Sequence, residues 1–247
     1  MNDISKQIGA AEMVTQPPPE PDCISVAEDK SLFVSATYML SAPVKIEPLL
    51  GKVIERGCTG QMFGPSGSGK SFVAIDMACA VGTGGKWNGN QCEQGIVLYF
   101  AGEGLAGLRR RVKAWHRHNN NADLSRVNIS RSVITFDAAG IRKVIVEVRQ
   151  LEEITGDKVA LIVIDTLARH IQGDENNTQN MSEFVQSVDG LRGAFPGSTA
   201  VIVHHTGNNA EATNRSRGSS ALKAACDFEI QCDKGLLTYT TCIPGLL

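Results

Sequence analysis

Short runs of apolar residues alternate with amphipathic stretches from Gly51 onward. In most of these runs the apolar residues are nearly continuous, a pattern typical of parallel strands that are covered on both faces. We therefore predict five strands, at Gly60–Phe63, Ile96–Phe100, Val159–Ile164, Ala200–Val203 and Phe228–Cys232.

Between these runs, apolar residues recur at helical spacing. One stripe contains Val144, Val148 and Leu151, and further helical runs cover Phe72–Val81 and Ala221–Ala225. Strands that alternate with helices predict an α/β fold, with a mainly parallel twisted sheet flanked by helices on both faces. Ligands of such sheets bind at the carboxyl ends of the strands. A second stripe contains Met181, Phe184, Val185, Val188 and Leu191.

The composition excludes several classes of protein. The chain has 247 residues, 42% of them hydrophobic, and a formal net charge of −2. This apolar content excludes disorder throughout, and the longest aliphatic run, Val159–Ile164, is too short for a membrane span of roughly 20 residues. The net charge excludes a uniformly basic nucleic-acid-binding surface but allows a local basic patch.

The scattered cysteines and the lack of a signal-like start favour reduced thiols and a cytoplasmic location.

The first 50 residues differ from the rest. They hold six of the nine prolines and seven acidic residues against three lysines. We predict that residues 1–50 form a partly disordered arm, in which Leu32–Leu40 packs onto the domain, and that residues 51–247 form one domain.

A glycine-rich stretch, GPSGSGKS, follows the first predicted strand and precedes a helical run. It fits the phosphate-loop pattern G-x-x-x-x-G-K-[ST]. Glycines let the backbone fold into a nest of N–H groups around phosphate oxygens, while Lys70 reaches the β- and γ-phosphates and Ser71 ligates Mg²⁺. We assign nucleotide binding to Gly64, Pro65, Ser66, Gly67, Ser68, Gly69, Lys70, Ser71 and the following Phe72.

Two acidic residues follow predicted strands. Asp165 ends the run VALIVID, where a carboxylate beside the phosphate loop can hold the metal through water. Glu103 lies in Ala101–Gly104, just after another strand, and can polarise a water for attack on the γ-phosphate. Alternatively, Glu103 is a surface residue of a glycine-flanked turn.

Two histidines and an arginine lie further along the chain. His204 and His205 end a predicted strand, and because adjacent side chains face opposite ways, only one of them lies on a given face. That histidine can hydrogen-bond the γ-phosphate; otherwise both are capping or core residues. Arg217, in the polar stretch Gly207–Ser220, is either a solvated charge or an arginine finger.

In these stretches the chain resembles the RepA-type branch of the RecA-like ATPases, which includes plasmid hexameric replicative helicases and phage AAA-family ATPases. The matching stretches are GPSGSGKSFVAIDMA, LYFAGEGLAGLRRRVKAW, IVIDTLARHIQGDEN and VIVHHTG followed by SRGSSAL. They span roughly Gly51 to Cys232, and their order makes the likeness specific. The chain ends soon after LTYTTC, where such proteins continue with further strands, so we expect a C-terminally shortened domain.

The resemblance implies a role for each of these residues. Glu103 corresponds to the catalytic glutamate, Asp165 to the metal-holding aspartate, and His204 or His205 to the γ-phosphate sensor. Arg217 corresponds to an arginine that reaches the nucleotide of the neighbouring subunit. Arg111 corresponds to an arginine that stacks on the adenine; alternatively, Arg109–Arg111 is a solvated helix face.

The resemblance implies a Mg²⁺-dependent ATPase that forms a hexameric ring and acts on single-stranded DNA as a helicase or translocase in phage or plasmid replication. One alternative is a nucleotide-gated loader or recombination accessory protein that does not unwind DNA. Another is a P-loop kinase, although Glu103 and the histidine pair argue against it.

Overall fold

The computed structural model describes residues 33–41, 47–51, 53–205, 220–234 and 236–241. The chain divides into two compact units, residues 1–45 and 46–247. In the first unit the described residues include helix α1 (Ala36–Ser41), which buries none of its residues. The second unit begins before the Gly51 boundary expected from the proline content. It includes strand β1 (Pro48–Leu50), whose two leucines are fully buried.

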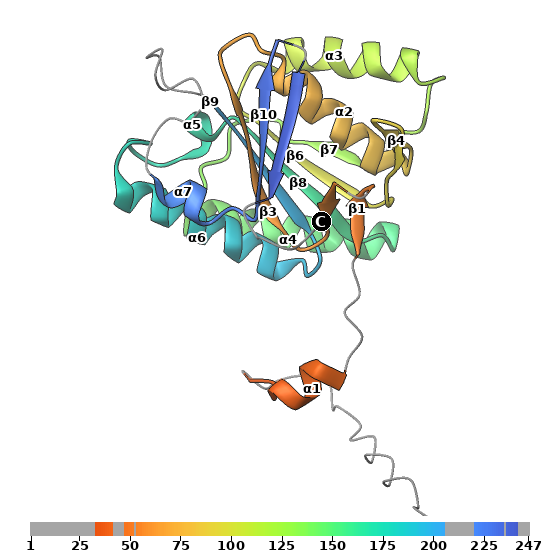
Figure 1. Cartoon of the computed structure of the whole chain (residues 1–247). Coiled ribbons are helices and arrows are strands. Elements are labelled where there is room, and N and C mark those ends of the chain that lie inside the picture. Colours follow the sequence, from red (N-terminus) through yellow and green to blue (C-terminus); the bar gives the residue numbers. More distant parts are fainter. Residues whose placement is uncertain (1–32, 42–46, 52, 206–219, 235, 242–247) are drawn as a thin grey trace, which may run out of the picture. The chain divides into compact units, whose positions relative to one another are not determined.

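A seven-stranded sheet forms the centre of the second unit, in the order β11-β10-β3-β9-β8-β6-β7 (Figure 1). Neighbouring strands run parallel from β10 to β7, and β11 pairs with β10 in the antiparallel sense. All five predicted strands belong to this sheet, which confirms the mainly parallel α/β architecture of a RecA-like P-loop NTPase. The bounds are β3 Thr59–Gly64, β6 Ile96–Ala101, β7 Val127–Ile129, β8 Val159–Asp165, β9 Thr199–His205, β10 Phe228–Asp233 and β11 Leu236–Thr241.

Several short strands were not predicted from the sequence. They include the three-residue edge strand β7 and two small antiparallel pairs outside the main sheet, β1 with β2 and β4 with β5. The other edge strand, β11, has six residues and was also not predicted. Strands of two or three residues are too short to show a periodic pattern. The bounds of the remaining three are β2 Ile54–Glu55, β4 Lys86–Trp87 and β5 Asn90–Gln91.

Helices cover both faces of the sheet (Figure 1). Helices α2 (Lys70–Thr83) and α3 (Leu105–His118) contribute to the core on one face. The core on the other face includes residues of α4, α5, α6 and α7, and the two predicted apolar stripes lie there on α4 and α6. None of the described helices is long and apolar enough to cross a membrane. The bounds are α4 Ala138–Thr155, α5 Leu167–His170, α6 Thr178–Ala194 and α7 Ser220–Ala224.

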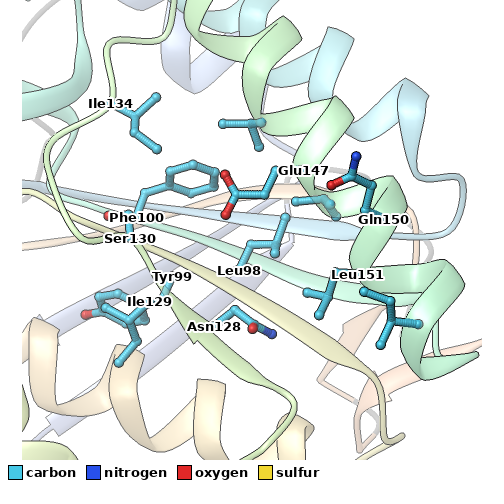
Figure 2. Close-up of a pocket in the computed structure, with 13 residues that line it drawn as sticks. Leu98, Tyr99, Phe100, Asn128, Ile129, Ser130, Ile134, Glu147, Gln150 and Leu151 are labelled. Atoms are coloured by element: carbon cyan, nitrogen blue, oxygen red, sulfur yellow. The ribbon is translucent and has the colours of Figure 1, made fainter.

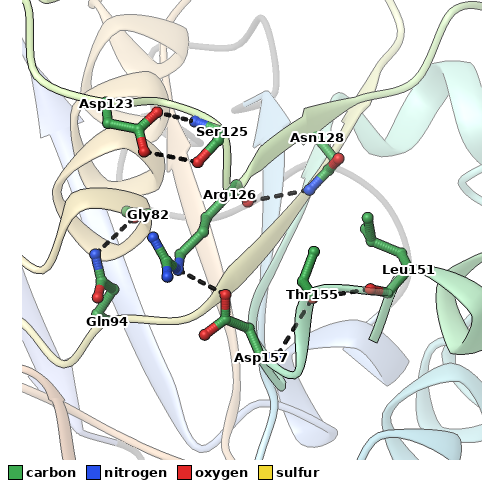
Figure 3. Close-up of polar contacts among 9 residues, drawn as sticks. All are labelled: Gly82, Gln94, Asp123, Ser125, Arg126, Asn128, Leu151, Thr155 and Asp157. Carbon is green, nitrogen blue, oxygen red and sulfur yellow. Dashed lines mark hydrogen bonds and ion pairs between the residues drawn. The ribbon is translucent and has the colours of Figure 1, made fainter. Parts of the chain in front are cut away.

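Polar contacts hold the sheet together where β7 and β8 begin (Figure 3). Arg126, just before β7, pairs through Nε with Asp157 Oδ2 at 2.8 Å, just before β8. The side-chain amide of Asn128 donates to the carbonyl of Arg126 at 3.1 Å. These contacts lie at the amino ends of the strands, whereas ligands of such sheets bind at the opposite, carboxyl ends.

Candidate active site

The phosphate loop links the end of β3 to the start of α2, as the sequence predicts. A Cβ at Gly64 would lie 2.1 Å from the carbonyl oxygen of Cys232, so only glycine fits there. Gly69 caps α2 with φ 93°, in the left-handed region that favours glycine. The loop therefore lies at the positive end of a helix, where N–H groups attract phosphate.

Lys70 is the first residue of α2, and its side chain folds back onto the loop. Its ammonium donates to the carbonyl oxygens of Gly64 at 2.9 Å and Pro65 at 2.8 Å. The residue is only 4% exposed. Burial lowers the pKa of Lys70, while Cys232, Asp165 and Glu103 oppose that shift. An ammonium has three N–H donors, so one remains for a phosphate oxygen.

The strand order brings the predicted site residues to one edge of the sheet. In the strand next to β3, His205 of β9 pairs in register with Gly64. Beyond β9 lies β8, which ends at Asp165, and Asp165 pairs in register with Ala101 of β6. Glu103 lies two residues after the end of β6. The phosphate loop, Asp165 and Glu103 thus lie at the carboxyl ends of nearby strands.

Asp165 is buried, and one of its two carboxylate oxygens has a partner. Oδ2 accepts a hydrogen bond from the hydroxyl of Tyr99 at 2.5 Å. Oδ1 is buried but accepts no hydrogen bond from any residue that the structure describes. A buried oxygen without a partner is costly, so Oδ1 suits a ligand such as a metal-bound water.

Tyr99 is a site residue that the sequence reasoning missed. Burial raises the pKa of its hydroxyl well above the usual value, and the charge of Asp165 adds to the shift. The hydroxyl therefore stays protonated and donates to Asp165. A possible signal was the single hydroxyl in the otherwise apolar strand β6.

The backbone just before Glu103 is held from two sides. The N–H of Gly102 donates to the carbonyl of Asp165 at 2.6 Å, and Nε of Arg169 donates to the carbonyl of Gly102 at 3.0 Å. The side chain of Glu103 lines a cavity of about 60 Å³ together with Asp165 and Arg111. Arg169 lies on α5, so a residue far along the chain positions the acidic turn.

The sequence predicts that Glu103 is the base for ATP hydrolysis. On that prediction, replacing Gly102 by alanine is expected to lower kcat about tenfold or more, because even a small misplacement of a catalytic group is costly. A Cβ at this position would lie 2.6 Å from Cβ of Arg169 and 2.9 Å from the carbonyl oxygen of Asp165. Steady-state kinetics and an ATP-binding titration would show reduced kcat with unchanged affinity. The control is Gly190→Ala on α6, where an added Cβ meets nothing within 4 Å. Unchanged kcat in Gly102→Ala would show that this turn does not position the reacting groups.

The two histidines at the end of β9 differ in their surroundings. Side chains alternate along the strand, which places His205 on the same face as Val203 and the buried side of α2. His204 is 1% exposed and lies on the face covered by α4 and α6. Burial and the positive charge of Lys70 lower the pKa of His205, whereas nearby acidic residues oppose the shift. His205 is therefore the histidine on the phosphate-loop side.

Arg111 contacts Phe72 beside the phosphate loop. The guanidinium carbon of Arg111 lies 4.8 Å from the centre of the Phe72 ring, which is a cation–π geometry. Phe72 is 61% exposed. Both residues therefore border the loop and remain candidates for contact with the base. Arg217 lies outside the described residues.

A separate groove of about 330 Å³ lies between α4 and strands β6 and β7 (Figure 2). Its lining is mostly apolar and includes Leu98, Phe100, Ile134 and Leu151, with Glu147 and Gln150 at α4. None of the predicted site residues lines it. The assignment of the active site therefore rests on the polar groups around the phosphate loop.

A family model described as an AAA domain matches residues 28–211 of the chain. The match includes the phosphate loop, Glu103, Asp165 and His205, and it ends before Arg217. None of the curated proteins matches the sequence.

Proposed function

We infer that the chain, which belongs to the AAA domain family and is a P-loop ATPase, works on DNA. Specifically, we propose a Mg²⁺-dependent helicase or translocase of the RepA type that forms a ring on DNA. The observation that carries the proposal is the gathering of the phosphate loop, a buried carboxylate and Glu103 at one sheet edge. ATP hydrolysis needs these three groups together. The DNA-directed part of the proposal rests on the resemblance of the sequence motifs.

In the proposed reaction, Glu103 accepts a proton from a water that attacks the γ-phosphorus in line with the leaving oxygen of ADP. The bond between the γ-phosphorus and the β–γ bridging oxygen breaks, giving ADP and phosphate. Lys70 holds the β- and γ-phosphates and offsets their growing charge. His205 hydrogen-bonds a γ-phosphate oxygen and so responds to its loss.

The residues beside the loop fit a magnesium ion. Mg²⁺ prefers oxygen ligands and keeps several waters, so it needs few protein ligands. Asp165, whose buried Oδ1 has no partner among the described residues, would hold a coordinated water, and the Ser71 hydroxyl would be a direct ligand. When bound, the ion offsets negative charge on the β- and γ-phosphates. In the described part of the chain no group of three or more His, Cys, Asp or Glu residues forms a metal site of its own.

Ring assembly follows from the proposed role of Arg217. An arginine finger supplied by a neighbouring subunit raises the rate on the order of 10³–10⁵. An isolated subunit should then hydrolyse ATP slowly, and the assembled ring is the active form.

Mixing Arg217→Ala subunits with Glu103→Gln subunits is expected to restore part of the ATPase activity that each variant lacks. In a mixed ring, some interfaces combine an intact Glu103 from one subunit with an intact Arg217 from its neighbour. Turnover is measured across mixing ratios, with mass photometry to show that the variants assemble together. Mixed assemblies without any recovery would rule out a finger in trans.

The DNA-directed part is tested by measuring ATP hydrolysis with and without single-stranded DNA, beside mass photometry. Stimulation by DNA in a multi-subunit species supports the motor. A rate of ATP hydrolysis that does not change with DNA instead supports a nucleotide-gated loader or accessory protein. Absence of Mg²⁺-dependent ATP binding would overturn both the motor hypothesis and the nucleotide-gated alternative.

A further inference from the structure

Helix α3 carries an unusual concentration of positive charge. Its 14 residues, LAGLRRRVKAWHRH, include five arginines and lysines and no acidic residue. The whole chain, by contrast, has a formal net charge of −2. The local basic patch that the composition allows therefore lies on this helix.

Four of these cations form one exposed surface, which we call the basic face of α3: Arg109, Arg110, Lys113 and Arg117. At 3.6 residues per turn they fall within an arc of about 100°, and at 1.5 Å per residue they extend about 12 Å along the axis. Among the described residues, none of these side chains forms an ion pair or hydrogen bond. Their charge is thus available to a partner.

The other side of α3 is occupied by contacts within the domain. Leu108 is buried in the core, and Val112 and Trp115 pack against the same core. The indole N–H of Trp115 donates to Asp76 Oδ1 of α2 at 2.7 Å. Figure 1 shows α3 lying over α2. Apart from the exposed Leu105 at its start, α3 presents charge and no apolar face to solvent, unlike a helix that inserts into a membrane surface.

Helix α4, on the opposite face of the sheet, shows that such charge is not general to the surface. It carries three cations, Arg142, Lys143 and Arg149, and three glutamates, so its net charge is +3 − 3 = 0. Opposite charges on one helix can offset one another along its surface. The uncompensated charge of α3 therefore sets this helix apart from α4.

We propose that the basic face of α3 binds the phosphate backbone of single-stranded DNA. The proposal rests on the proposed function and names the surface that would contact the strand. A row of arginines and a lysine supplies charge-assisted donors to successive phosphates, and such contacts need no particular base sequence. An acidic protein segment is the alternative partner, and the experiment below separates the two.

The position of α3 links this surface to the catalytic turn. The helix begins at Leu105, two residues after Glu103, and its Arg111 lines the same cavity as Glu103 and Asp165. A strand bound along α3 would therefore favour one position of the helix and of the turn before it. DNA bound at this surface should raise the rate of ATP hydrolysis.

The test is a triple variant, Arg109→Gln, Lys113→Gln and Arg117→Gln, which removes three charges and keeps residues with good helix propensity. The matched control is Arg142→Gln, Lys143→Gln and Arg149→Gln on α4, which changes the net charge equally. Binding of a fluorescein-labelled oligothymidylate is measured by anisotropy over a range of salt concentrations. ATP hydrolysis is measured with and without the same oligonucleotide, and thermal unfolding checks that both variants are folded.

The α3 variant should bind DNA more weakly than the wild type, and its plot of log affinity against log salt should be shallower by about 2, at about 0.7 per lost phosphate contact. Its DNA-independent ATPase rate should be unchanged, while its stimulation by DNA is lost. The α4 control should behave like the wild type.

An unchanged salt slope in the folded α3 variant, or equal losses in both variants, would overturn the proposal. So would a wild-type protein that hydrolyses ATP but does not bind the oligonucleotide, an outcome that leaves the ATPase assignment intact and points to a protein partner. Absence of ATP hydrolysis by the wild-type protein, both with and without the oligonucleotide, would instead contradict the proposed function.

Discussion

Replacing Lys70 by alanine is expected to raise the Kd for ATP about 10- to 150-fold, the effect of losing a hydrogen bond to a charged phosphate. Hydrolysis should fall below detection, because Lys70 also offsets the charge that develops on the γ-phosphate. The buried ammonium already lies at the phosphate loop, with two of its donors on the loop carbonyls. Calorimetry with ATP and Mg²⁺, together with a phosphate-release assay, measures both effects.

The control for this prediction is Lys86→Ala, because Lys86 is an exposed lysine on the short strand β4. It removes the same charge from the chain without touching the loop. Thermal unfolding of the Lys70 variant must show that the domain remains folded after the buried side chain is removed. Unaltered affinity in a folded Lys70→Ala protein would mean that nucleotide binds elsewhere.

Replacing Glu103 by glutamine is expected to lower kcat about 10²- to 10⁴-fold, the contribution of a general base. Glutamine has nearly the same shape but cannot accept the proton of the attacking water. ATP binding should remain close to that of the wild type, because the phosphate contacts come from the loop and Lys70. Single-turnover hydrolysis and an ATP titration separate the two quantities.

Glu153→Gln is the matched control, since Glu153 is exposed on α4. This variant should hydrolyse ATP at the wild-type rate. If Glu103→Gln lost ATP binding as severely as Lys70→Ala, Glu103 would be a binding residue rather than the base. If its kcat did not change, Glu103 would be the surface residue of a turn.

The main strands and the phosphate loop could be predicted because their signals are local. Each of the five predicted strands is a single unbroken stretch of sequence, and the structure confirms them as β3, β6, β8, β9 and β10. The loop is one unbroken stretch whose glycines, lysine and serine each have a fixed task. The same reasoning failed at β7 and β1, where strands of three residues depend on pairing with their neighbours.

Contacts between residues that are far apart in the chain could not be predicted from the sequence. Tyr99 and Asp165 are 66 residues apart, and Arg169 bonds to Gly102 from 67 residues away. No spacing rule connects such pairs, because the strand order of the sheet decides which residues meet. The sequence likewise could not distinguish His204 from His205, because only the tertiary structure shows which face of β9 is turned to α2.

The sequence by itself determined the chemistry of this protein: a phosphate-binding loop, a carboxylate at the end of a strand and a mainly parallel sheet. Each of these depends on residues that are close together in the chain. The tertiary structure decided how those groups combine, by bringing Glu103 beside Asp165, Tyr99 onto its carboxylate and the cations of α3 onto one exposed surface. The physical reason is that burial and strand pairing are properties of the whole domain, since they depend on every element that packs around a residue.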